Sequence, residues 1–192
     1  DQDRARGILC ELDEGQVLFH LEAAPSGSLV AGIIGTPPAG ENPYTLKLTC
    51  WDTETQIEVS SFNLPNESFP SNLEFSNDGS RVAVVFGLRT IRDGEVKPDP
   101  QQIEESMIRL YRVADGQHLL DLPTPVHSGR ASVAFNDDDR LLAAPNVITS
   151  EIDVWNLESG SKQIKLKGAK PESSLVFAPT GDRLVAHANG FQ

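Results

Sequence analysis

The 192-residue chain carries 28 acidic and 16 basic residues, so its formal net charge is −12 at pH 7. Nucleic acid and anionic membranes are bound through clustered lysine and arginine, and this balance excludes both as expected partners. No apolar run approaches the ~20 residues of a membrane-spanning helix, and the first residues lack the apolar stretch of a signal peptide. The acidic surface serves solubility, or alternatively attracts a cationic partner.

One pattern recurs along the chain: an apolar stretch, a tight polar turn and a second apolar stretch. Glycine accepts a positive φ at such turns, Asn and Asp tolerate it, and Pro presets the entry. Val, Leu and Phe suit a pleated, half-buried surface. Each copy therefore predicts a β-hairpin, whose strands we name a and b. The copies lie at residues 24–31, 75–83, 135–143 and 177–186.

A second pattern alternates with the first and places a large side chain before a polar turn. Its slot is occupied by Cys10, Trp51, Tyr111 and Trp155, at spacings of 41, 60 and 44 residues. Two of these spacings match the ~40–45 residues of a four-stranded repeat, and the long one requires an insertion. The pattern predicts strands c and d, with Trp51 and Trp155 packed between neighbouring repeats.

The phrases FSNDGSRVAV, LTCWDTETQ, VWNLESGS and FAPTGDRLVA resemble the WD40 family over nearly the whole chain. The resemblance implies an all-β fold, a β-propeller of four-stranded antiparallel blades. We expect three full blades and complementary half-blades at the two ends. The predicted ranges are 7–21 (strands c and d), 22–63 (a blade), 70–122 (a blade with an insertion at 88–105), 128–168 (a blade) and 172–192 (strands a and b).

The resemblance is degenerate, because only Trp51-Asp52 keeps the family's WD dipeptide. The family often ties a blade together through a His, a Ser or Thr in strand b, an Asp and the strand-c Trp. Here His127 stands near the first position and Trp155 at the last, but Ala143 and Ala144 occupy the region of the hydroxyl. We therefore expect this network to be absent and hydrophobic packing to hold the blades together.

The complementary ends allow three arrangements, since closing a ring removes open sheet edges. The chain forms an arc of a larger ring, closes on itself as a four-bladed propeller, or pairs with a second copy in an eight-bladed ring. Seven or eight blades are typical of the family, which favours the arc and a place in a larger protein.

The two cysteines, Cys10 and Cys50, are too few for a disulfide framework. The strand assignment places them in different blades and on opposite faces, so we expect both to be free, buried and small apolar side chains. This usage favours a reducing compartment such as the cytoplasm.

Sequence motifs of catalysis are missing. The four histidines are scattered without metal-ligand spacing, and neither a Walker A sequence nor a nucleophile elbow occurs. Asp137–Asp139 lacks the calcium-loop frame and is predicted to be a solvated turn. We expect no enzyme activity, cofactor or metal. The alternative is part of a quinoprotein- or lactonase-like propeller enzyme whose active site needs residues outside this chain.

The long connections predict where a partner binds. In an antiparallel meander the a–b and c–d turns share one edge of each sheet, and the longer b–c and d–a connections share the other. Binding residues concentrate on long loops of rigid scaffolds. We therefore expect a protein- or peptide-binding scaffold that uses aromatic and basic side chains of these loops: Tyr44, Phe69, Arg89, Arg92, Lys97, His127 and Arg130.

Overall fold

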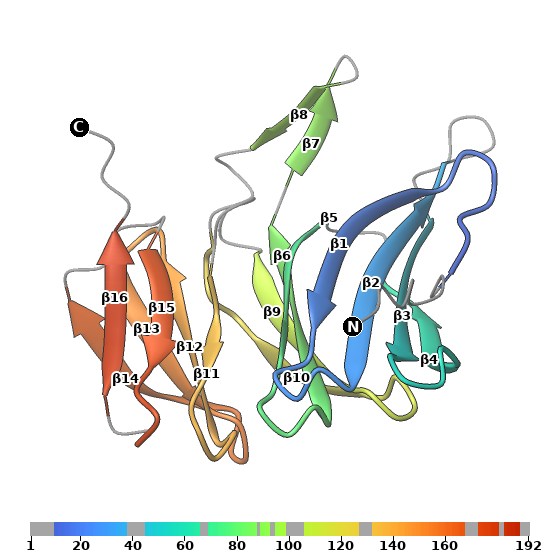
Figure 1. Ribbon diagram of the computed structural model, residues 1–192. Helices are drawn as coiled ribbons and strands as arrows, with labels where there is room; N and C mark the ends of the chain where they lie inside the picture. Colours follow the sequence, from blue (N-terminus) through green and yellow to red (C-terminus); the bar gives the residue numbers. More distant parts are fainter. Residues whose placement is uncertain are drawn as a thin grey trace.

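The computed structural model describes residues 10–37, 45–65, 69–87, 89–92, 95–98, 106–126, 132–167, 173–180 and 183–188. These residues form strands, turns and extended segments, and none of them lies in a helix that could cross a membrane. Figure 1 shows the strands in chain order. They are β1 (Val17–Ala23), β2 (Leu29–Thr36), β3 (Thr45–Asp52), β4 (Glu58–Asn63), β5 (Phe69–Phe75), β6 (Arg81–Gly87), β7 (Arg89–Arg92), β8 (Glu95–Pro98), β9 (Met107–Arg112), β10 (His118–Leu122), β11 (Ala134–Phe135), β12 (Leu141–Asn146), β13 (Glu151–Asn156), β14 (Ser161–Lys167), β15 (Ser173–Phe177) and β16 (Leu184–Ala188).

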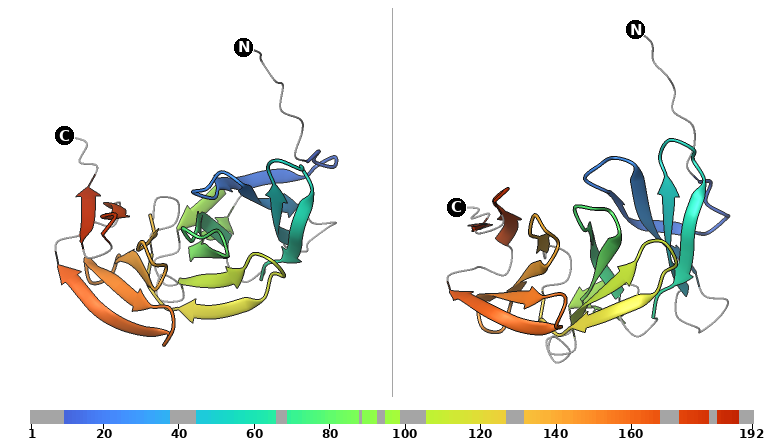
Figure 2. Two further views of the ribbon diagram at one scale, coloured as in Figure 1. Left: turned by 60° about the horizontal axis from the view of Figure 1, so that its bottom comes forward. Right: turned by 90° about the horizontal axis from the view of Figure 1, so that it is seen from below.

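The strands pair as antiparallel meanders. Blade 1 is β1-β2-β3-β4, blade 2 is β5-β6-β9-β10, and blade 3 is β11-β12-β13-β14. The half-blade contains β15 and β16, and β7 pairs only with β8. The blades follow one another along an arc (Figure 2). The predicted all-β architecture of four-stranded antiparallel blades is confirmed.

The first boundary predicted from the sequence needs correction. Residues 17–23 form β1, the innermost strand of blade 1, whereas the sequence analysis gave residues 7–21 to strands c and d of a preceding blade. A turn does precede β1, since Gln16 N donates to Asp13 O. Between this turn and the next hairpin turn at Gly27 there is room for one strand, while a d strand followed by an a strand needs two.

The third hairpin turn has an aspartate where the second has a glycine. It has the same length as the second, because Asn136 N donates to Leu141 O just as Ser76 N donates to Arg81 O. Asp139 therefore takes the place of Gly79, and both are left-handed, with φ of 57° and 70°. Asp tolerates this conformation better than most residues.

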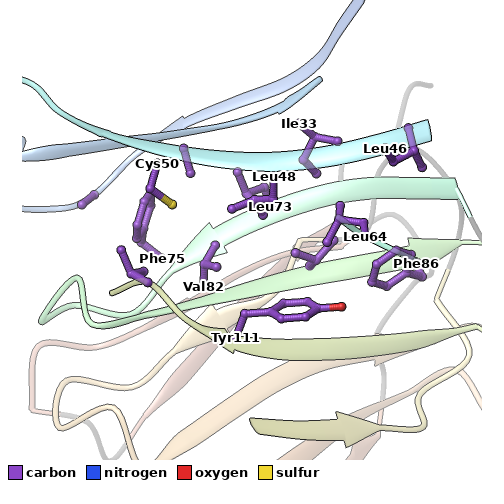
Figure 3. Close-up of a cluster of buried hydrophobic side chains, with 14 residues drawn as sticks. Ile33, Leu46, Leu48, Cys50, Leu64, Leu73, Phe75, Val82, Phe86 and Tyr111 are labelled. Atoms are coloured by element: carbon purple, nitrogen blue, oxygen red, sulfur yellow. The ribbon is translucent and has the colours of Figure 1, made fainter. Parts of the chain in front are cut away.

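Neighbouring blades are held together by apolar side chains. Figure 3 shows the cluster between blades 1 and 2, where Leu48 and Cys50 of β3 face Leu73 and Val82. A second cluster joins blades 2 and 3, and a third joins blade 3 to the half-blade. Burying such side chains stabilises the fold by about 1.5–3 kcal/mol each. Apolar packing between sheets is thus the main source of cohesion.

The aromatic slot always faces the preceding blade. Tyr111 of blade 2 lies in the cluster shared with blade 1, and Trp155 of blade 3 in the cluster shared with blade 2. Trp51 pairs with Val30, on the face of blade 1 opposite to Ala31 and Cys50. The prediction that both tryptophans pack between blades holds for Trp155, while Trp51 lies on the blade 1 face that points away from blade 2.

Polar contacts also join the blades, which corrects the expectation of purely hydrophobic cohesion. Trp155 Nε1 donates to Thr124 Oγ1 over 2.8 Å, and Thr124 belongs to the connection that leaves blade 2. Ala143 and Ala144 do leave strand b without a hydroxyl, as the sequence indicated. The hydroxyl comes from a residue 31 positions earlier instead.

Asp139 makes the most extensive of these polar contacts. Its Oδ1 accepts hydrogen bonds from the Asn77 backbone N–H and side-chain amide, both over 2.8 Å, and its Oδ2 accepts from Asp78 N–H over 2.9 Å. The Asp139 carbonyl accepts from the Arg81 guanidinium. Hydrogen bonds to a charged group are stronger than neutral ones. Asp139 therefore clamps the a–b turns of blades 2 and 3 together.

Substitutions of Asp139 should separate its role as a hydrogen-bond acceptor from its role in the left-handed turn. We expect Asp139→Ala to lower the free energy of unfolding by about 2–4 kcal/mol, because it removes the acceptor and keeps a Cβ in a left-handed turn. Asp139→Gly should cost less, since it relieves the turn, and Asp139→Asn least, since one oxygen remains. Chemical denaturation measures all three. An equal loss for Asp137→Ala, a substitution at an exposed neighbour, would contradict the clamp.

The two cysteines are both free, and they differ in exposure. Cys50 is buried, and burial raises the pKa of its thiol to about 11, opposed by the Ser60 hydroxyl. Cys10 is exposed, so the expectation that both are buried is wrong for Cys10. Its segment precedes blade 1 and does not form strand c, to which the sequence pattern assigned it.

Thiol titration should therefore give two counts. At pH 8 the native protein should react rapidly at one thiol, Cys10, because the Cys50 thiolate is both buried and disfavoured. Unfolding without reductant should raise the count to two. Rapid reaction in Cys10→Ser would show that Cys50 is accessible, and zero thiols after unfolding would reveal a disulfide.

Candidate functional site

The two edges of the sheets carry different connections. The a–b and c–d turns lie together, since Val113 N donates to Ser80 O over 2.9 Å and Leu157 N donates to Arg140 O over 2.8 Å. On the other edge, Val147 N donates to Pro125 O over 2.8 Å and joins a b–c turn to a d–a connection. We call this second edge, with the b–c and d–a connections, the long-loop face.

The insertion of blade 2 forms a hairpin on the long-loop face. Strands β7 and β8 pair from Arg89↔Pro98 to Arg92↔Glu95, and Figure 1 shows them projecting beyond the blades. From the sequence, residues 88–105 are expected to be a loop insertion without strands. A hairpin is stiffer than an irregular loop, because its backbone groups are paired.

The residues predicted to bind a partner fall into two groups. Arg89 and Arg92 lie on β7, Lys97 lies on β8, and Phe69 begins β5. The register Phe69↔Gly87 puts the start of β5 beside the strand end that leads into β7. The structure thus brings four of the predicted positions to one part of the long-loop face. Tyr44, His127 and Arg130 lie outside the described residues.

A groove that the sequence analysis did not predict lies between blades 1 and 2. It has a volume of about 440 Å³ and is lined by residues of β4 and the connection after it and by residues of β9, β10 and the turn between them. This size is in the range of small-molecule and side-chain pockets. The lining residues used below are Phe62, Pro65, Arg109, Tyr111, His118 and Asp121.

Three rings form the apolar part of the groove. The centroids of Phe62 and Tyr111 are 5.1 Å apart, and those of Tyr111 and His118 are 5.6 Å apart with the rings edge to face. Tyr111 is only 4% exposed, so it forms the floor, while Phe62 is half-buried and His118 exposed. Burial raises the pKa of the Tyr111 hydroxyl, and the nearby Arg109 charge opposes that shift.

Two opposite charges complete the groove. Arg109 Nε lies 3.1 Å from Asp121 Oδ1, and His118 Nε2 lies 2.8 Å from the same oxygen. The Arg109 Nε–H makes no directed hydrogen bond, so its contact with Asp121 is an ion pair by proximity. The guanidinium also stands 5.4 Å from the centroid of the Phe86 ring. Arg109 is 19% exposed and Asp121 is 47% exposed, so the carboxylate is the more accessible charge.

The sequence held one signal for this groove. Arg109 interrupts the apolar run of β9 between Ile108 and Leu110, at a position whose alternate neighbours face blade 1. Its cross-strand partner is Asp121. A charged residue at an inward position opposite a charge of the other sign is typical of a buried ion pair, but it becomes visible only once the register is known.

Another perturbed carboxyl lies on an inner strand of blade 2. Burial and, in second place, the negative charge of Glu22 on β1 raise the pKa of Glu74 on β5 to about 7. The pKa of Glu22 is itself raised by burial. Adjacent inner strands thus place two acidic residues close enough to repel each other.

The raised pKa of Glu74 predicts that the free energy of unfolding depends on pH. The folded-state pKa of Glu74 exceeds its ordinary value of 4.5, so its contribution is fully favourable below pH 4.5 and is lost as pH rises through 7. We expect Glu74→Gln to remove about 2–3 kcal/mol of the change in unfolding free energy between pH 5 and pH 8. Equilibrium denaturation at both values measures it. An identical pH profile for Glu74→Gln and for the exposed control Glu58→Gln would exclude Glu74 as the cause.

Among the described residues, no group of three or more His, Cys, Asp or Glu side chains is arranged to hold a metal ion. Asp137 and Asp138 lie in an exposed turn, and Asp139 points its carboxylate at the neighbouring turn.

No known family model matches the chain. Coronin-7 of Rattus norvegicus is 30% identical over 97 residues, which is 45% of this chain and 10% of coronin-7. The chain therefore spans about a tenth of this curated relative.

Solved structures show the same fold. The trilobed protease β-propeller domain of Pyrococcus furiosus, with an open velcro topology, superposes with a TM-score of 0.59 and 14% identity over 92% of this chain and 49% of that one. Hydrazine synthase of Kuenenia stuttgartiensis superposes with a TM-score of 0.57 and 13% identity, over 86% of this chain and 54% of that one. The Cps50 (Swd1) β-propeller domain of Myceliophteria thermophila superposes with a TM-score of 0.56 and 16% identity, over 90% of this chain and 48% of that one. The chain thus has a β-propeller fold and spans about half of each of these solved chains, and its repeat motifs resemble those of the WD40 family.

Proposed function

We propose that this WD40-like chain is a non-catalytic scaffold that binds a protein or peptide through its long-loop face. The observation that carries the proposal is the β7–β8 hairpin, a paired element projecting from blade 2. Blade 2 is packed on both sides by apolar clusters, so the hairpin stands on a rigid base. Rigid scaffolds with projecting loops are a common arrangement for recognition, and Arg is enriched among residues that dominate binding energy.

The likeness to coronin-7 and to the Swd1 propeller domain supports a binding role, because WD40 propellers generally bind proteins. The hairpin carries Arg89, Arg92 and Lys97 on a chain of net charge −12. The basic residues alternate with acidic ones such as Glu95 on β8, so the hairpin offers charges of both signs to a partner.

The second candidate function is part of a propeller enzyme, and the likeness to hydrazine synthase supports it. Metal analysis of the purified protein and a turnover screen distinguish the two. A stoichiometric metal or quinone, with turnover, would favour the enzyme over the scaffold.

The scaffold proposal is tested with peptides selected against the protein from a random peptide library. Replacing residues 88–105 by a short Gly-Ser turn should abolish binding of the selected peptides, and Arg89→Ala with Arg92→Ala should weaken it about tenfold or more. The melting temperature should stay unchanged, since β7 and β8 pair only with each other. Isothermal titration calorimetry gives the affinities.

The matched control is Glu158→Ala in a c–d turn of the opposite edge, which should bind as the wild type does. If Glu158→Ala weakened binding and the hairpin variants did not, the long-loop face would not be the binding surface.

A further inference from the structure

We propose that the groove between blades 1 and 2 binds an arginine side chain of a partner peptide. This site is separate from the predicted residues of the long-loop face, and it stands or falls independently of them. The guanidinium would lie over the Tyr111 floor between Phe62 and His118 and pair with the carboxylate of Asp121.

The ring arrangement fits a planar cation. The ring centroid of Tyr111 lies 5.1 Å from that of Phe62 and 5.6 Å from that of His118, so three rings line the groove. A cation within about 6 Å of an aromatic centroid is attracted by the ring, and arginine stacks on rings more readily than lysine. The same chain shows this pairing, since Arg109 stands 5.4 Å from the Phe86 centroid.

The accessible charge in the groove is negative. Asp121 directs Oδ1 to Arg109 and His118, and its side chain is still 47% exposed. Arg109 is 19% exposed and lies against both Asp121 and Phe86, so its guanidinium is the less accessible charge of the pair. An arriving guanidinium therefore meets a carboxylate at the surface, and the net charge of −12 draws cations toward the whole molecule.

The opposite ligand, a carboxylate, fits less well. Arg109 Nε and His118 Nε2 lie 3.1 and 2.8 Å from the same oxygen of Asp121, which thus takes the place that a ligand anion would need. This gives a specific consequence: removal of the Asp121 charge should convert a cation site into an anion site.

The test uses three capped tripeptides: tri-arginine, its uncharged analogue tri-citrulline, and tri-glutamate. Tri-arginine should bind the wild-type protein, with tri-citrulline at least tenfold weaker, since citrulline keeps the planar shape and lacks the charge. Asp121→Asn should weaken tri-arginine binding about tenfold, the loss of one charge-assisted contact. Phe62→Leu should weaken it as well, and Asp121→Asn should bind tri-glutamate more tightly than the wild type does.

Asp115→Asn is the matched control. Asp115 is 52% exposed and pairs with Arg112 at 3.0 Å, so it resembles Asp121 in exposure and partner, while it lies outside the groove. Its substitution should change tri-arginine affinity less than twofold. Equal losses in Asp115→Asn and Asp121→Asn would reduce the effect to general charge attraction and overturn the proposal.

The wild-type protein gives an independent readout should Asp121→Asn fail to fold. In a tri-arginine titration followed by NMR, the ring resonances of His118 and Phe62 should shift, and those of His187 on the half-blade should not. Unshifted His118 and Phe62 resonances, or tighter binding of tri-glutamate than of tri-arginine, would overturn the proposal. If the selected peptides bound equally well without the hairpin while tri-arginine still bound the groove, only the proposed function of the long-loop face would be overturned.

Discussion

Strand β6 shares its side chains between two cores, and this division holds the arc together. Val82, Val84 and Phe86 point into the cluster with blade 1, while Ala83 and Val85 point into the cluster with blade 3. Successive residues of a strand face opposite sides of its sheet, so a strand covered on both sides must be apolar throughout. The unbroken run Val82–Phe86 meets this requirement. Each blade therefore depends on its neighbours to cover its apolar faces, and the long-loop face and the groove between blades 1 and 2 depend on that stack.

Polar contacts add order to this apolar stack without replacing it. Apolar packing tolerates small shifts between sheets, whereas Asp139 accepts three hydrogen bonds from the turn at Asn77 and Asp78 and fixes how the two turns meet. Trp155 and Thr124 fix the same pair of blades at a second point. The repulsion between Glu22 and Glu74 acts in the opposite direction, on the inner strands of blades 1 and 2. The interfaces between blades thus combine apolar packing, hydrogen bonds and, at one place, repulsion between carboxylates.

Much of the fold could be predicted from the sequence because its signals are local. A polar turn such as the one at Gly79 predicts a hairpin from neighbouring residues alone. The aromatic slot at Tyr111 and Trp155 recurs in register with these hairpins. The strand and turn assignments were wrong or incomplete where one sequence pattern is compatible with two local structures. The turn after Asp13 looks like a c–d turn, yet it leads into an inner strand, and Asp139 fills a position that glycine fills elsewhere.

The groove could not be predicted for a different reason. Phe62 and Tyr111 are far apart in the sequence and meet only because blades 1 and 2 stack. The pairing of Arg109 with Asp121 depends on the register of β9 and β10, which contains a bulge between His118 and Leu120. A bulge shifts the facing of every residue beyond it, and no residue type at this position signals one. Binding sites between repeats are therefore less visible in a sequence than the repeats themselves.

The constant orientation of the aromatic slot gives the arc a direction. Tyr111 and Trp155 each reach back to the blade before them, and Trp51 has the same position on the face of blade 1 that points away from blade 2. Such a stack has a direction, as a filament has, because the two faces of each blade are different. Duplication of one repeat in the gene would insert a blade whose two faces already fit its neighbours, without any new interface having to evolve. The number of blades can thus change during evolution while each contact between blades stays the same.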